Sequence, residues 1–143
     1  LYRKHGPEML PKLRGMYAFG IWDALERTLF LARDPFGIKP LYYFDDGKNF
    51  RFASQVKALI AGGKVQRRIE LAAQVGFFIW GSVPEPLTIY QDVRALPAGT
   101  WLQVSRRQVG EPIRHYCIAE TFLRAEAAPR GGQTAEGRQE SNA

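Results

Sequence analysis

The chain has 143 residues, 45% of them hydrophobic and 13% aromatic, which is enough apolar material for the core of one domain. Its net charge of +6 is scattered along the chain, which disfavours nucleic acid as a partner, and no apolar run approaches the roughly 20 residues of a membrane span. A single cysteine and two histidines argue against a disulfide framework and against a zinc site, and they fit a reducing cytoplasm.

The first third of the chain predicts short helices and then a β-hairpin. Two short helices are expected within residues 1–14, because Gly6-Pro7 interrupts the helical pattern. The aromatic run over 16–22 predicts a strand buried on both faces or nearly so. Residues 28–32 predict a second strand that pairs with the first.

A second pair of strands and a helix are expected next. The strands are predicted at 40–44 and 50–53, with a turn between them that contains Gly47. Ser54 is the predicted N-cap of a short helix over 55–61.

A longer helix is expected over 69–80. Leu71, Val75 and Phe78 share one face of this helix, with Phe77 and Trp80 close by. Because aromatic side chains bury large apolar areas, we expect this cluster to pack into the core rather than line a ligand pocket.

The remaining chain predicts two strands and a tail. The strands are expected at 100–104 and 113–117. From about Glu126 the sequence is rich in Gly, Gln, Glu and Arg, and we expect residues 118–143 to be a disordered tail.

The most informative stretch is the loop that follows the strand at 28–32. Arg33 and Asp34 open it, Gly37 permits a positive φ, and Pro40 fixes the path at its end. These four residues predict an architectural loop with one built shape. The Arg-Asp pair could also bind an anion or a carboxylate, but we favour a role in bracing the loop.

The loop and three other stretches, in this order along the chain, resemble the class II glutamine amidotransferases, and the asparagine synthases are the most similar group. The similar stretches are Leu13–Asp23, Phe30–Tyr43, Phe52–Leu59, and Val83–Tyr90 with Arg94–Thr100. The resemblance covers residues 1–117 and implies an α+β fold, namely the αββα sandwich of antiparallel sheets found in N-terminal-nucleophile hydrolases. We expect 1–117 to be the C-terminal half of such a glutaminase domain, with the first half of the sandwich missing.

The resemblance also implies a mechanism that depends on residues outside the matched stretches. In this family a cysteine at the mature N-terminus attacks the glutamine amide, and its own α-amino group acts as the base. We therefore expect no catalytic, substrate-binding or metal-ligating residue in this chain. The family's synthetase domain uses ATP and Mg to convert aspartate to asparagine, so that domain and the first half of the glutaminase domain are the expected partners.

Cys117 is the one alternative nucleophile. His115 would share its face on a strand, and a Cys–His pair is a known nucleophilic arrangement. We favour a structural, half-buried thiol at a strand end.

The leading hypothesis is therefore a fragment of a glutamine-dependent asparagine synthase, which on its own is inactive. Two alternatives stay open. The chain could be a non-catalytic interaction module, or it could come from an amidotransferase of purine or amino-sugar synthesis.

Overall fold

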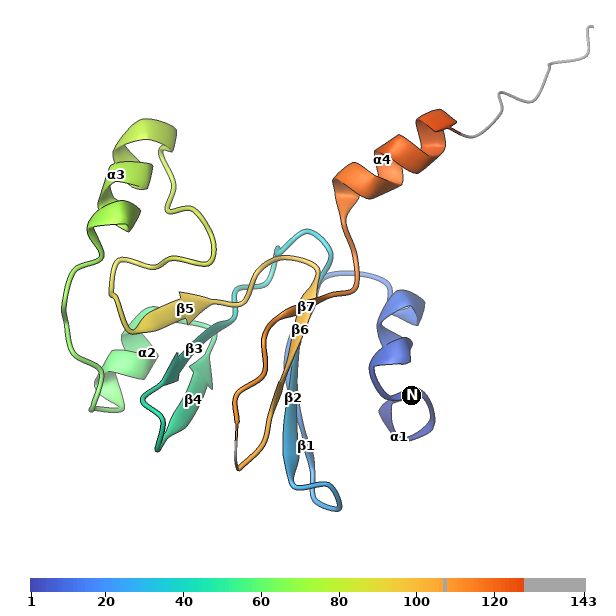
Figure 1. The fold of residues 1–143 in the computed structure, drawn as a ribbon, viewed down its shortest axis with the longest axis horizontal. Helices are drawn as coiled ribbons and strands as arrows, with labels where there is room; N and C mark the ends of the chain where they lie inside the picture. Colours follow the sequence, from blue (N-terminus) through green and yellow to red (C-terminus); the bar gives the residue numbers. More distant parts are fainter. Residues whose placement is uncertain (107, 128–143) are drawn as a thin grey trace, which may run out of the picture.

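The computed structural model describes residues 1–106 and 108–127 (Figure 1). The helical elements are α1 (Tyr2–His5), the 3-10 helix η1 (Gly6–Lys12), α2 (Val56–Ala61), α3 (Leu71–Trp80) and α4 (Ile118–Ala127). The strands are β1 (Ala18–Asp23), β2 (Thr28–Arg33), β3 (Tyr42–Asp45), β4 (Phe50–Ala53), β5 (Val93–Ala95), β6 (Thr100–Val104) and β7 (Ile113–Arg114). In the described part of the chain, no helix has the length and apolarity needed to cross a membrane.

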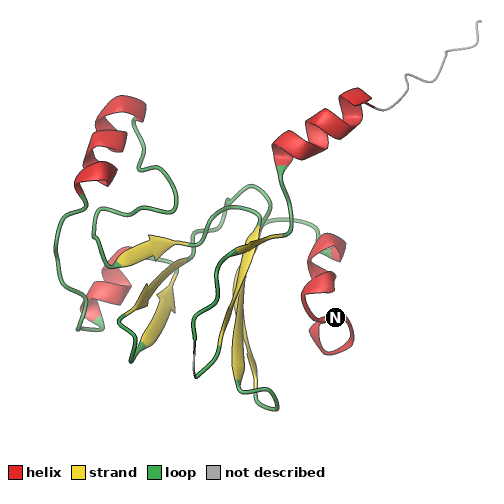
Figure 2. Ribbon diagram, viewed as in Figure 1, coloured by secondary structure: helices red, strands yellow, loops and turns green. Residues whose placement is uncertain are grey.

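The strands form two antiparallel sheets, which confirms the predicted α+β class (Figure 2). The first sheet has the order β1-β2-β6-β7 and the second the order β4-β3-β5. The predicted hairpin is confirmed, because β1 pairs with β2 from Ala18↔Arg33 to Asp23↔Thr28.

An apolar core joins the two sheets face to face. Leu31 of β2 and Leu102 of β6 come from the first sheet and are fully buried. Tyr43 of β3 and Phe50 of β4 pack against the same cluster from the second sheet. The sheets are therefore the two inner layers of the fold.

Short helices cover the outer face of each sheet. Met9 and Leu10 of η1 pack on Phe30 in the first sheet. On the second sheet, Leu59 of α2 packs on Phe44. The resulting order of layers is helix, sheet, sheet, helix.

Covering on both faces explains the composition of β2. Phe30 and Ala32 point to the helical layer and Leu31 points to the other sheet, because side chains alternate along a strand. The prediction that the strand within 16–22 is buried on both faces is wrong, because Trp22 of β1 is 59% exposed. In the described residues β1 is the edge strand of its sheet, so one of its faces is only partly covered.

A groove of about 560 Å³ lies between the edge strands β1 and β4. Ala18 and Gly20 line it from the first sheet, and Leu41 and Phe52 line it from the side of the second. The groove thus opens where both sheets end.

Two local predictions need correction. The N-cap of α2 is Gln55 rather than Ser54, because Gln55 still has extended backbone angles. The last strand covers only Ile113–Arg114, because the N–H groups of His115 and Tyr116 donate to Gly99 O instead of continuing the ladder.

The predicted disordered tail also differs in part from the structure. Its first residues form α4, which extends away from the sheets (Figure 1). The rest of that prediction, residues 128–143, lies outside the described residues.

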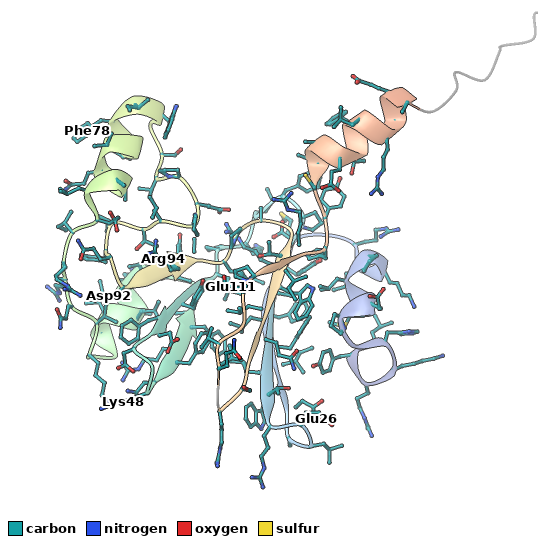
Figure 3. The ribbon with its side chains drawn as sticks, viewed as in Figure 1. Glu26, Lys48, Phe78, Asp92, Arg94 and Glu111 are labelled. Atoms are coloured by element: carbon teal, nitrogen blue, oxygen red, sulfur yellow. The ribbon has the colours of Figure 1, made fainter. Side chains whose placement is uncertain are left out.

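The largest departure from the sequence-based expectation is α3. Its small residues Ala73 and Gly76 are buried, whereas Phe78 is 84% exposed and Trp80 is 68% exposed. Figure 3 shows Phe78 on the outer side of the helix. The prediction that the aromatic cluster packs into the core is therefore wrong.

Candidate functional site

The loop after β2 is organised by the buried carboxylate of Asp34. Its Oδ1 accepts hydrogen bonds from the backbone N–H groups of Phe36 (3.1 Å) and Ile38 (3.0 Å), and its Oδ2 accepts one from Lys39 (2.9 Å). Burial works to raise the pKa of this carboxyl, but these N–H donors hold the pKa below its ordinary value. Asp34 is therefore a fixed anion that shapes the loop around itself.

Arg33 holds the same loop from the other side. Its Nε donates to Lys39 O (2.9 Å) and its Nη2 donates to Gly37 O (2.8 Å). Nη1 donates to the carbonyl oxygen of Leu96, which lies far along the chain. The guanidinium thus ties the loop to the segment before β6.

Glu85 completes this tie, and sequence reasoning did not find it. Its Oε1 lies 2.6 Å from Arg33 Nη1, and its Oε2 accepts from Ala98 N (3.0 Å). The sequence offers one signal, which is a charged residue enclosed by Pro84 and Pro86. The Arg33 side chain is 9% exposed, so the ion pair is largely shielded from water on that side.

Gly99 joins the loop to the chain that follows β7. Its N–H donates to Asp34 O, and its carbonyl accepts from the N–H groups of His115 and Tyr116. Its φ is +64°, and a Cβ there would stand 2.5 Å from Tyr116 O. Only glycine fits this junction without displacing backbone.

The four residues predicted to build the loop lie together. Arg33 and Asp34 are buried, and Gly37 has a φ of +64° with its Cβ position 3.0 Å from Arg33 Nη2. Pro40 follows Lys39, whose carbonyl and N–H are bound by Arg33 and Asp34.

A cavity of about 440 Å³ lies next to the loop. Its walls are mostly apolar and include Leu10, Met16 and Phe36, with Asp34 and His115 as polar members. The side chains of Arg33 and Asp34 form hydrogen bonds with groups of their own chain. Their role at this site is therefore to hold the backbone of the loop in place.

Cys117 and His115 do not form a nucleophilic pair in the described residues. The His115 ring donates from Nε2 to Arg33 O (3.1 Å) and stacks on Tyr17. Both residues lie after β7 and not on a strand, so the expected shared face does not form.

Within the described stretches, no three His, Cys, Asp or Glu side chains come together as metal ligands would.

Comparison with known proteins gives a consistent set of relatives. A family model described as "Glutamine amidotransferase domain" matches residues 1–117. Asparagine synthetase [glutamine-hydrolyzing] 1 of Bacillus subtilis is 40% identical over 101 residues, which cover 69% of this chain and 16% of that protein. A Mycobacterium tuberculosis protein, provisionally named as a glutamine-hydrolysing asparagine synthetase, is 36% identical over 120 residues, which cover 82% of this chain and 18% of the relative. The chain therefore spans less than a fifth of the length of these relatives.

Proposed function

The chain belongs to the class II glutamine amidotransferase domains of the asparagine synthetase type, and from this premise we propose that it forms the second half of a glutaminase domain that supplies ammonia for asparagine synthesis. In that reaction glutamine is hydrolysed to glutamate, and the ammonia converts ATP-activated aspartate to asparagine. The match of the family model to residues 1–117 is the observation that carries the proposal.

The layers of the fold support the placement of this chain within an N-terminal-nucleophile hydrolase sandwich. Two antiparallel sheets lie between helical layers, and the groove between β1 and β4 leaves one end of both sheets open. Additional strands from the rest of a glutaminase domain could pair with the free edge of β1, because an edge strand presents unpaired N–H and C=O groups.

We assign an architectural role to the loop of Arg33, Asp34, Gly37 and Pro40. The contacts of Arg33 and Asp34 go to backbone groups and to Glu85, which supports bracing rather than substrate binding. Catalysis is left to a cysteine with a free α-amino group, which Cys117 cannot supply from inside the chain. These 143 residues alone are therefore proposed not to hydrolyse glutamine.

The synthetase part of the proposed assembly would bind ATP, Mg and aspartate. We also propose a cytoplasmic location. The single cysteine supports this location, because it fits a reducing compartment. The relatives named above are asparagine synthetases, which favours this acceptor over those of purine or amino-sugar synthesis.

A chimeric enzyme tests the proposal. Residues of this chain replace the matching stretch of Bacillus subtilis asparagine synthetase 1, and glutamate release from glutamine is measured. We expect the chimera to release glutamate and to form asparagine. A chimera that folds and forms asparagine from added ammonia, yet releases no glutamate, would contradict the proposed function.

A further inference from the structure

We propose that the outward face of α3, defined by Leu71, Val75, Phe78 and Ile79, is the docking surface for the polypeptide that full-length asparagine synthetases carry beyond the stretch matched here. The proposal rests on the proposed function, because it names the partner of the same domain. The partner is the remaining, larger part of the synthetase polypeptide.

The composition and exposure of α3 are the first support. The helix has the sequence LAAQVGFFIW, without a charged residue, and its large side chains face outward. Leu71 is 70% exposed, Ile79 63% and Phe78 84%. A helix that is apolar on nearly all sides is normally buried inside a larger protein.

The packing of α3 on its own chain explains why these side chains do not turn inward. Gly76 approaches the loop after the helix so closely that a Cβ there would stand 2.4 Å from Pro84 Cδ. Ala73, which is fully buried, lies on the same side. Only small residues fit where α3 contacts the following loop. The large side chains of the outward face therefore point away from the molecule.

An apolar groove adjoins the outward face. It has a volume of about 320 Å³ and is lined by Phe77 and Phe78 of the helix and by Val83 and Ile89 of the following loop. A groove of this kind can receive a large apolar side chain, which is how the central anchors of protein interfaces are held.

The charge pattern favours a protein as the occupant. Helices that lie on membranes carry Lys and Arg on a polar face, and α3 has neither. Cores of protein interfaces are depleted of charge and enriched in aromatic residues, as α3 is. A second copy is less favoured, because each chain brings a net charge of +6.

The length of the relatives supports the choice of the partner that docks on α3. More than four fifths of each lies outside the matched stretch, since the match covers 16% of one and 18% of the other. Figure 1 shows α3 at the upper left, extending beyond the sheets, with α4 at the upper right. A large partner can therefore reach α3 without meeting the sheets.

The test measures binding of the full 143-residue chain to Bacillus subtilis asparagine synthetase 1 that lacks its matching 101 residues. The variants are Phe78→Asp and Leu71→Asp, and the matched control is Leu25→Asp. Leu25 is 92% exposed in the turn between β1 and β2, at the end of the molecule marked by Glu26 in Figure 3. Leu71 opens α3, where an acidic residue interacts favourably with the helix dipole, so this variant should keep its fold.

We expect the unaltered chain and Leu25→Asp to bind with equal affinity. Both α3 variants should bind with an affinity lower by at least about tenfold. The proposal is overturned if the unaltered chain does not bind, or if the α3 variants bind as tightly as the control. It is also overturned if Phe78→Asp instead abolishes self-association of the chain or its sedimentation with phosphatidylglycerol vesicles. A complex that forms through α3 but releases no glutamate counts against the proposed function and leaves the docking surface standing.

Discussion

At the scale of single residues, the loop at 33–40 depends on two fixed charges with opposite tasks. Asp34 gathers backbone N–H groups from within the loop, and Arg33 gathers carbonyls from the loop and from Leu96. Backbone polar groups that cannot reach water need such partners. The loop is consequently sensitive to substitutions that preserve size but change charge or hydrogen bonding.

Asp34→Asn tests the contribution of the carboxylate charge. We expect the free energy of unfolding to fall by about 2 kcal/mol at neutral pH, because hydrogen bonds to a charged acceptor are lost. The folded pKa of Asp34 lies below its unfolded value of about 3.9. The stabilisation is therefore present above that value and is lost as the pH falls through the folded pKa.

The measurement is urea unfolding of both proteins between pH 7 and pH 3, where the difference should narrow in the acidic range. Asp92→Asn is the control, because Asp92 pairs with the exposed Arg68 at 3.3 Å, and we expect a change of less than about 0.5 kcal/mol. A difference at Asp34 that stays constant down to pH 3 would refute the assigned role of its charge.

Gly99→Ala tests the junction between the loop and the chain after β7. The added Cβ meets Tyr116 O and the backbone keeps a positive φ, so we expect a loss of about 3 kcal/mol in thermal or chemical unfolding. Gly47→Ala is the matched control, because its φ is +78° and no atom lies within 4 Å of its Cβ position. It should cost about 1 kcal/mol. Equal effects of the two substitutions would mean that the close approach to Tyr116 is not limiting.

At the scale of elements, the sequence predicts well those features that depend on neighbouring residues in the chain. β4 occupies the predicted residues, and β2 extends the prediction by one residue. The loop residues could be chosen because Pro and Gly restrict or extend φ in a known way. The partner of Arg33 could not be chosen, because Glu85 lies 52 residues further along the chain.

The orientation of α3 could not be predicted from the sequence for a similar reason. Periodicity assigns Leu71, Val75 and Phe78 to one face but does not say whether that face meets the core or a partner. The close contact of Gly76 with Pro84 decides the matter, and it depends on the path of the following loop. Tertiary packing therefore overrides the usual rule that the larger apolar face turns inward.

Phe78→Ala and Phe30→Ala together test this orientation. Phe78 is 84% exposed, so its truncation should change the free energy of unfolding by less than about 0.5 kcal/mol. Phe30 is 1% exposed in the core under η1, and its truncation should cost about 3–5 kcal/mol. Chemical denaturation of both variants provides the comparison, and a large loss at Phe78 would place α3 in the core after all.

At the scale of the whole molecule, the described residues leave surfaces that other protein could complete. The free edge of β1 borders the groove toward β4, and α3 presents an uncharged apolar face elsewhere. Such features favour association, since edge strands pair and large apolar patches mark interaction sites. This is the behaviour expected of a domain that works inside a larger enzyme.

Glutamate release by the purified 143-residue chain in the presence of glutamine tests the central claim most directly. The account predicts no release above a protein-free blank, and the same result for Cys117→Ser. Turnover by the unaltered chain that disappears in Cys117→Ser would contradict it, because the chain would then hold a working nucleophile of its own.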